Sequence, residues 1–282
     1  MQPRPERTTG STFVSRPPQG TPFACGLSTP GAARMQIWDV AEQKSRPAPD
    51  RGRTLRSVSG IYPDGPPSGE AEALLATQRQ VARAMRRVTR MDVGPRPQVP
   101  PGPAIHAANH RSMADLLLST GTFSHWGWPI RPLVAGAYFD KPGLGGLLRR
   151  LRCVPVHGTE AIDRAVEVLE QGWSVAIMPE GRVVPEEEWA STGVGRSHPG
   201  IGRVAIDTGL PVVANGASGT EVFWPRGRSF PILRPGRRCH LVLRSEVVGP
   251  VPDDKSRDAT SRIMEAVARC VAVSDRITGR TT

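Results

Sequence analysis

The stretch Asn109-His110-Arg111-Ser112-Met113-Ala114-Asp115 lies between two mostly apolar segments, residues 104–108 and residues 116–118. An apolar run, a polar turn and a second apolar run predict a buried strand that leads through the turn into a helix. In sheets with parallel strands, side chains at the carboxyl end of a strand face the crevice where ligands bind. The stretch therefore predicts an α/β fold with a functional site directly after residue 108.

Two interpretations of this polar turn stay open. The imidazole of His110, with the carboxylate of Asp115 five residues later, suits general-base chemistry, because the carboxylate fixes the ring tautomer and stabilises its protonated form. The same turn also fits a capping box, with Ser112 as N-cap and Asp115 reaching back from the third helical position. A histidine and an acid at this spacing are a weak signal alone, so the downstream sequence has to decide.

A second polar turn follows about seventy residues later. The apolar run 173–178 ends in Pro179-Glu180-Gly181-Arg182. Such a turn presents one carboxylate, a glycine whose backbone can approach a ligand closely, and a guanidinium suited to an oxyanion or a phosphate. By itself it is more typical of an ordinary turn.

Strand and helix patterns alternate along the chain, which predicts an α/β fold with a mixed, partly parallel sheet flanked by helices. The expected strands are residues 104–108, 132–135, 153–156, 173–178, 211–214 and 240–244, and the expected helices are residues 70–91, 116–122, 144–151, 160–171, 201–208 and 261–271. Residues 183–200 are polar and rich in glycine and proline, and we expect a surface loop there.

The chain divides at about residue 69. Residues 1–69 contain 11 prolines and 8 glycines, a composition that predicts a disordered basic tail. Residues 70–282 are expected to form the folded domain. Residues 70–91 open it as a basic amphipathic helix, which suits either docking on an anionic membrane or packing on the domain by its apolar face.

Bulk composition narrows the classes of partner. The 282 residues carry a net charge of +11, with a pI of about 10.8, so we expect anionic partners. Aromatic residues make up only 5%, which disfavours a base-stacking surface, and we expect no nucleic acid. Four widely spaced cysteines predict a reducing cytoplasm, and no apolar run of bilayer-spanning length occurs.

In combination the motifs resemble those of the glycerolipid acyltransferases, the lysophosphatidate (1-acylglycerol-3-phosphate) acyltransferase superfamily, over roughly residues 85–250. That family carries Asn-His-x-Ser-x-x-Asp, matched by residues 109–115. Its Phe-Pro-Glu-Gly-Thr-Arg-Ser block is matched in part by residues 178–184, and its apolar segment around a proline by residues 209–214. Order and spacing agree, which is more specific than any single block.

The resemblance implies a fold, a reaction and a set of site residues. His110 is implied to act as general base on an acceptor hydroxyl, with Asp115 orienting its ring. The implied substrate-binding residues are Asn109, Ser112, Glu180, Gly181 and Arg182. The acyl donor would be acyl-CoA or acyl-carrier protein and the acceptor a lyso-lipid. Neither a metal nor a further cofactor is expected, and the expected location is cytoplasmic, peripheral on the inner face of the cell membrane.

Departures from the family pattern lie in the half of the site that reads the acceptor. An aspartate-arginine pair usually ends the second block, where this chain has His157-Gly158, and the usual arginine of the third block is replaced by Val183. We expect Arg182 to take over, helped by Arg149, Arg150 or Arg152. Alternatively the acceptor is another lyso-lipid, such as one with an amino-acid head group, or a specialised metabolite. A basic nucleic-acid- or membrane-binding protein without catalysis is the alternative from another class.

Overall fold

The structure is a computed structural model, and it describes residues 62–234, 236–251 and 255–280. Residues 1–61, most of the predicted tail, lie outside the described residues, so the disorder of that tail and the domain boundary at residue 69 stay predictions. Residues 62–67 lead into the first helix, α1 (Ser68–Val88), and the ring of Tyr62 packs against the main hydrophobic core.

Seven strands of the described residues form one sheet, with the order β1-β7-β6-β2-β5-β3-β4. All neighbouring strands are parallel except β6 and β7, which pair antiparallel, and this confirms the predicted mixed, partly parallel sheet. The strands are β1 (Thr89–Val93), β2 (Ile105–Ala108), β3 (Ile130–Ala135), β4 (Val154–Val156), β5 (Ser174–Ile177), β6 (Val212–Ser218) and β7 (Cys239–Gly249).

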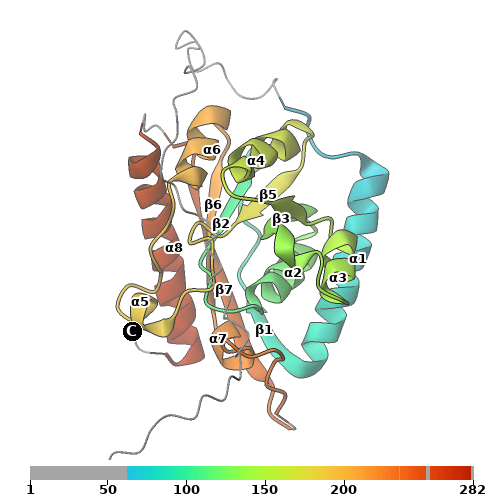
Figure 1. Cartoon of the computed structure of the whole chain (residues 1–282), viewed down its shortest axis with the longest axis vertical. Coiled ribbons are helices and arrows are strands. Elements are labelled where there is room, and N and C mark those ends of the chain that lie inside the picture. The colour runs from blue at the N-terminus through green and yellow to red at the C-terminus, as the bar shows by residue number, and fades with distance from the viewer. Residues whose placement is uncertain (1–61, 235, 252–254, 281–282) are drawn as a thin grey trace, which may run out of the picture. The chain divides into compact units, whose positions relative to one another are not determined.

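Helices cover both faces of this sheet (Figure 1). On one face lie α4 (Glu160–Glu170), α6 (Gly200–Thr208) and α8 (Ser256–Thr278), and on the other α1 and α2 (Asp115–Trp126). The helix α3 (Leu144–Arg150) packs beside this second face. Three short helices complete the described part of the chain: η1 (Gly136–Tyr138), α5 (Glu186–Trp189) and α7 (Thr220–Phe223).

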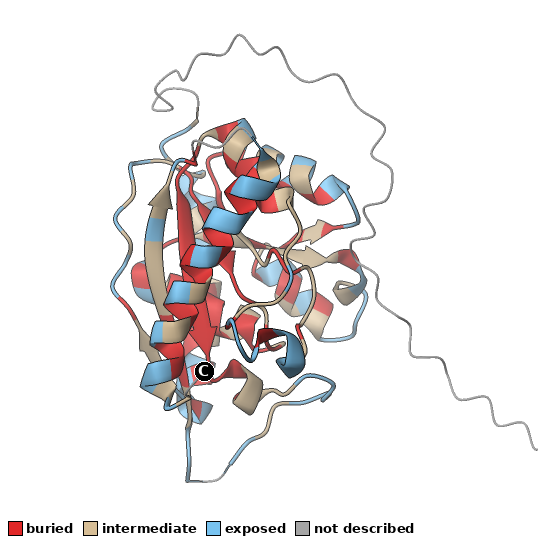
Figure 2. Ribbon diagram, turned by 90° about the vertical axis from the view of Figure 1, so that its left-hand side faces the viewer, coloured by how far each residue is buried: buried red, intermediate tan, exposed pale blue. Residues whose placement is uncertain are grey.

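Alternating side chains of the central strands build the two cores. On β2, Ile105 and Ala107 join the core under α4, α6 and α8, whereas His106 points to the opposite side, among the rings of Phe123 and Trp128. Figure 2 shows buried residues along the sheet and on the helix faces that look toward it. Such strands, covered on both faces, explain the nearly continuous apolar runs in the sequence.

Close packing of α8 on β6 depends on one glycine. A Cβ atom built on Gly216 would lie 2.1 Å from the backbone nitrogen of Val271, so no larger residue fits there without displacing the helix. The hydroxyl of Ser274 donates to the carbonyl of Gly216 at 2.7 Å. This contact fixes the C-terminal half of α8 against the sheet.

Three boundaries differ from the sequence-based expectation. The predicted helix 70–91 ends at Val88, and β1 was missed, because this short edge strand is stabilised by pairing with the distant β7. The predicted helix 261–271 extends over the whole of α8. The loop 183–200 contains α5, and its Val184 and Trp189 are buried, so it is not only a surface loop.

The connections that leave β2 and β5 run in opposite directions. From β2 the chain passes through α2 to β3, and from the neighbouring β5 it passes through α5 and α6 back across β2 to β6. Because α2 and α6 cover opposite faces, the carboxyl ends of β2 and β5 form a topological switch point, the usual position of a ligand site in such sheets. Among the described residues, no helix combines the length and apolar character that crossing a bilayer requires.

Candidate active site

His110 and Asp115 meet directly after β2. The Nδ1 atom of His110 lies 3.0 Å from Oδ2 of Asp115, and the same oxygen accepts a 2.8 Å hydrogen bond from the backbone N–H of Ser112. One carboxylate oxygen thus reaches back to the turn and holds the imidazole as well, but the predicted capping box is not formed, because α2 begins at Asp115 with Ala114, not Ser112, as its N-cap. Asp115 is 1% exposed and opens α2, where the helix dipole favours a negative charge.

The arrangement leaves the other ring nitrogen free for chemistry. An Nδ1–H donated to Asp115 leaves Nε2 of His110 unprotonated, which is the form that a general base needs. The side chain of His110 is 20% exposed, so it remains open to solvent while its partner is sealed.

Asn109 and Ser112 are fully buried, and their polar atoms bind the backbone. The amide of Asn109 donates to the carbonyl of Ala217 at 3.1 Å and accepts from the N–H of Ala217 at 2.8 Å, which ties the end of β2 to β6. The hydroxyl of Ser112 donates to the carbonyl of Trp224 at 2.6 Å and accepts from Ala114 N–H at 3.0 Å. These contacts position the turn; direct binding of substrate by either side chain stays a prediction.

Glu180 comes from the end of β5 and lies against the same turn. Its Oε2 accepts the backbone N–H of His110, and its Oε1 accepts the N–H of Gly195 at 2.6 Å. The side chain is 1% exposed, and burial raises its pKa, an effect opposed by the Gly195 N–H and by His110. The predicted convergence of His110, Asp115 and Glu180 is thus present, but Glu180 holds the backbone of the turn rather than facing solvent.

Gly181 and Arg182 shape the turn after β5. Gly181 has φ of +66°, a left-handed conformation that favours glycine, and its N–H donates to Met178. Arg182 is partly exposed and makes a two-pronged ion pair with Glu188 at 2.6 and 2.8 Å. A phosphate group would therefore compete with Glu188 for this guanidinium.

The site also depends on Arg111, which sequence reasoning passed over. Its guanidinium is 1% exposed and binds both carboxylate oxygens of Asp275 near the end of α8, at 2.9 and 3.0 Å. It further donates to the carbonyl of Gly193 and lies 3.9 Å from the ring centre of Trp189. Trp189 is 78 residues away from Arg111 in sequence and Asp275 is 164 residues away, so no local pattern could reveal these contacts.

The acceptor-reading positions remain unlike those of the family pattern. His157 follows β4, one of the two edge strands, and packs against Gly136. The expected helper arginines are occupied elsewhere: Arg150 donates to Gln80 at 2.9 Å and Arg152 pairs with Glu70 at 2.6 Å, both on α1. Arg149 donates to the carbonyl of Phe139. In the described part of the chain, no three acidic, histidine or cysteine side chains are arranged to hold a metal ion.

Comparison with known proteins identifies the family. The model of the acyltransferase family matches residues 59–217, more than half of the chain, and this range includes both polar turns. The chain belongs to the acyltransferase family. This acyltransferase therefore carries its family motif at the switch point of the sheet, where His110 and Asp115 meet.

Two relatives extend this finding. The acyltransferase is 28% identical over 171 residues to the chloroplastic 1-acyl-sn-glycerol-3-phosphate acyltransferase LPAT1 of Arabidopsis thaliana, a match that covers 58% of this chain and 45% of that protein. The chain thus matches less than half the length of that relative. Its fold is similar to that of the 1-acyl-sn-glycerophosphate acyltransferase PlsC from Thermotoga maritima, with a TM-score of 0.60 and 22% identity over 74% of this chain and 81% of that one.

Proposed function

We propose that this acyltransferase moves a fatty acyl group from a thioester, acyl-CoA or acyl-carrier protein, to the free hydroxyl of 1-acylglycerol-3-phosphate, forming phosphatidate for phospholipid biosynthesis. The observation that carries the proposal is the pair of His110 and Asp115, 3.0 Å apart, with only the histidine open to solvent. The relative from Arabidopsis, a 1-acyl-sn-glycerol-3-phosphate acyltransferase, supports the choice of acceptor.

In the proposed reaction His110 moves one proton. Its Nε2 takes the proton of the acceptor hydroxyl as the hydroxyl oxygen attacks the thioester carbonyl. The tetrahedral intermediate then collapses, the carbon–sulfur bond breaks, and the imidazolium returns the proton to the departing sulfur. Asp115 stabilises the imidazolium between these steps, and its burial strengthens that interaction by excluding water.

Neither a covalent intermediate nor a resident cofactor has a part in this scheme. A thioester is already activated toward an oxygen nucleophile, so no serine or cysteine has to accept the acyl group. Ser112 is poorly suited to that role, because its hydroxyl is buried and donates to the carbonyl of Trp224. We assign Ser112, Asn109 and Glu180 to positioning the turn that carries His110.

A second acceptor is favoured by the altered acceptor half of the site. The position of the usual arginine holds Gly158, Arg182 is paired with Glu188, and Arg152 is paired with Glu70. A lyso-lipid with an amino-acid head group, or another hydroxyl-bearing metabolite, would need no phosphate-binding arginine. The mechanism at His110 would be the same for either acceptor.

A thiol-release assay with a panel of acceptors tests the proposal. Both donors are offered with 1-acylglycerol-3-phosphate, with neutral lyso-lipids and with amino-acid lyso-lipids. We expect turnover that His110→Ala lowers by about a hundredfold or more, whereas His125→Ala, an exposed histidine on α2, retains it. Undiminished turnover in His110→Ala would refute the proposed base, and turnover only on lyso-lipids without a phosphate would replace the first acceptor by the second.

A lipid acceptor also implies a place in the cell. We propose that the protein works in the cytoplasm as a peripheral protein on the inner face of the cell membrane, where lyso-lipids are accessible. Its positive net charge of +11 supports attraction to an anionic leaflet.

A further inference from the structure

A surface loop between α7 and β7 exposes two large apolar side chains. In this loop, residues 225–238 and here called the arginine loop, Phe230 is 79% exposed and Leu233 is 61% exposed. The other large hydrophobic residues with notable exposure among the described residues reach at most 39%. Residue 235 of the loop is not described. Two strongly exposed apolar side chains three positions apart indicate a surface that is covered by something else.

The same loop is densely cationic. Its five arginines, all exposed, are Arg226, Arg228, Arg234, Arg237 and Arg238. None of the five forms an ion pair with another described residue, in contrast to the arginines of α4, α6 and α8 that pair with neighbouring acids. Unneutralised cations around exposed apolar groups fit an anionic, partly apolar partner.

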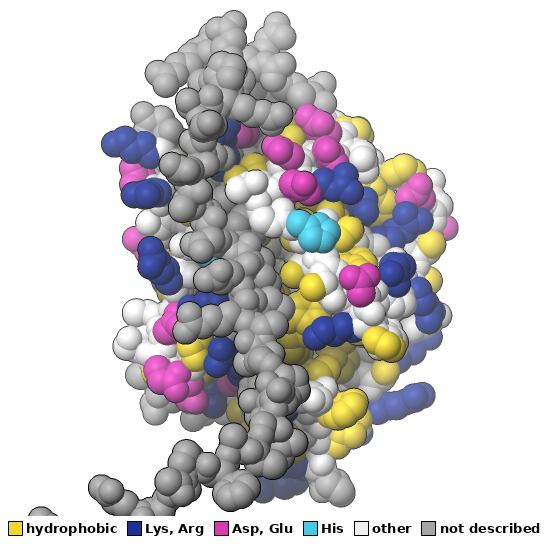
Figure 3. All heavy atoms as spheres, in the orientation of Figure 1, with side chains coloured by type: hydrophobic (Ala, Val, Ile, Leu, Met, Phe, Trp, Pro, Cys, Tyr) yellow, Lys and Arg dark blue, Asp and Glu magenta, His cyan; other side chains and the backbone are white. Residues whose placement is uncertain are grey.

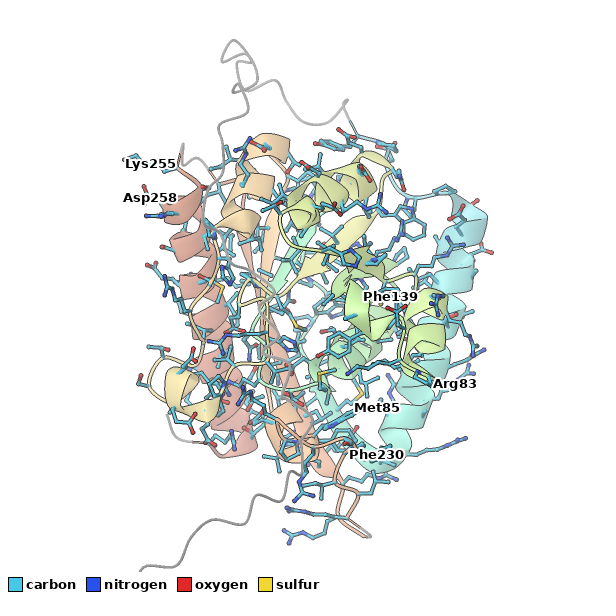
Figure 4. All side chains as sticks on the ribbon, viewed as in Figure 1. Arg83, Met85, Phe139, Phe230, Lys255 and Asp258 are labelled. Carbon is cyan, nitrogen blue, oxygen red and sulfur yellow. The ribbon has the colours of Figure 1, made fainter. Side chains whose placement is uncertain are left out.

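Hydrogen bonds fix the base of the arginine loop. The N–H of Ile232 donates to the carbonyl of Phe223 at 2.7 Å, and the indole N–H of Trp224 donates to the carbonyl of Arg228 at 2.8 Å. Phe230 lies between Arg228 and Ile232, Leu233 directly follows Ile232, and Figure 4 shows Phe230 in the lower part of the molecule in that view. The apolar side chains are therefore presented outward by a braced loop.

The last turn of α1 continues this surface. In the parallel pairing of β1 with β7, Thr89 lies opposite Cys239, so Arg238 at the end of the loop adjoins the end of α1. The exposed side chains there are Arg86, Arg87, Val88 and Arg90. Figure 3 shows lysine and arginine side chains along the edge where α1 lies. The end of α1 and the arginine loop thus form one cationic surface that also exposes apolar side chains.

This surface lies at the same edge of the sheet as the candidate active site. The arginine loop connects the carboxyl end of β6 to the start of the antiparallel β7, and β2 and β5 end at that edge too. A direct contact joins the two regions, because Ser112 donates to the carbonyl of Trp224 at the base of the loop. A partner held by the loop would therefore lie beside the turn that carries His110.

We propose that the arginine loop docks on an anionic phospholipid bilayer, with Phe230 and Leu233 inserted among the acyl chains and the arginines on lipid phosphates. This proposal rests on the proposed function in one respect: the lipid acceptor of that function would be found in the bilayer. An acidic protein surface would need carboxylates in fixed positions, whereas a bilayer supplies both phosphates and an apolar layer to any protruding side chain.

Vesicle flotation of the full chain tests this proposal without any turnover. The vesicles are phosphatidylcholine alone or phosphatidylcholine with phosphatidylglycerol. We expect binding only to the anionic vesicles, lowered about tenfold or more by Phe230→Ser with Leu233→Ser. The matched control is Val273→Ser with Ile277→Ser on α8, which we expect to bind as the unmodified chain does.

A charge series separates the loop from general electrostatic attraction. Replacing Arg226, Arg228 and Arg234 by glutamine should weaken binding about tenfold and flatten its dependence on salt. The control variant loses three positive charges outside the loop, at Arg164, Arg203 and Arg269, and its binding to vesicles should be weakened far less. Equal losses in both triple variants would overturn the proposal.

Two further results would also overturn it. One is unchanged vesicle binding after Phe230 and Leu233 are replaced; the other is binding of acyl-carrier protein through the loop by a chain that ignores anionic vesicles. His110→Ala should float like the unmodified chain, so a failure of the proposed chemistry is distinguished from a failure of docking.

Discussion

The carboxylate of Asp275 neutralises the guanidinium of Arg111 through two contacts, at 2.9 and 3.0 Å, with 1% of either side chain exposed. The hydroxyl of Ser218 donates to the same carboxylate at 2.6 Å. The turn that carries His110 is therefore supported from below by the last turns of α8.

Breaking this ion pair should destabilise the fold. Asp275→Leu leaves a buried guanidinium without its anion, and we expect the free energy of unfolding to fall by about 3–5 kcal/mol in urea titrations. Replacing both partners, Arg111→Met with Asp275→Leu, should recover most of that loss. A single variant as stable as the unmodified chain would contradict the role assigned to the pair.

Loss of the Asp115 charge should lower the rate more than it disturbs the turn. Asp115→Asn keeps an oxygen for the N–H of Ser112 and the imidazole of His110, but it no longer stabilises the imidazolium. We expect kcat/KM to fall by about 10²–10⁴-fold, measured as thiol release. Combining it with His110→Ala should cost little more, because the two residues act as a unit. Additive losses would argue against a shared function.

Replacing Glu180 tests a positioning residue. Both of its oxygens accept backbone N–H groups, so Glu180→Gln turns an amide donor toward one of them and loosens the turn. We expect kcat to fall about tenfold or more with a smaller change in KM, together with faster amide hydrogen exchange at His110 and Gly195. A rise in KM alone would instead indicate direct contact with the acceptor.

The pH dependence of stability gives Glu180 a second readout. Burial raises its pKa above the 4.5 of an exposed glutamate, so the folded state holds a proton that the unfolded state releases. Its contribution to stability is therefore present below pH 4.5 and is lost as pH rises through the raised pKa. When the midpoint of urea unfolding is measured as a function of pH, the Glu180→Gln variant should not show this loss of stability.

His106 should make the fold sensitive to acid. Complete burial, with a smaller effect of the Arg96 charge, lowers its pKa from 6.5 to about 3. Its neutral ring is packed 4.6 Å from that of Trp128, so stability present above pH 6.5 should decline as pH falls toward about 3. In His106→Leu the midpoint of urea unfolding should depend less on pH between pH 6.5 and 5. In His125→Leu, which replaces an exposed histidine, this pH dependence should be unchanged.

Arg182 and Glu188 offer a test of how the acceptor is read. If the acceptor phosphate competes with Glu188 for this guanidinium, Glu188→Gln should lower KM for 1-acylglycerol-3-phosphate about threefold, and Arg182→Gln should raise it by a similar factor. Neutral lyso-lipids serve as the control substrate. Unchanged KM values in both variants would place the phosphate elsewhere.

Much of the site could be predicted because it is local in sequence. His110 and Asp115 are held together by one turn between β2 and α2, and the pattern of apolar and polar residues fixes such a turn. From the family resemblance, Glu180 was predicted at the same place. Its orientation was not, since the pattern does not say whether a carboxylate faces solvent or a backbone N–H.

What the sequence did not reveal depends on distant partners. β1 is a strand only because β7 pairs with it, and residue-by-residue preference gave a continued helix instead. Trp189 reads as part of a polar loop, but it is buried over Arg111, whose own partner Asp275 lies near the chain's end. Contacts that join separate elements leave no periodic trace in either segment.

The antiparallel pairing of β7 to β6 has a practical consequence for protein engineering. It reverses the chain, so α8 starts at the far edge of the sheet and delivers Asp275 and Thr278 to the edge that carries His110. A stop codon shortly after residue 271, which an alignment of motifs alone would treat as harmless trimming, would remove the underside of the reaction centre.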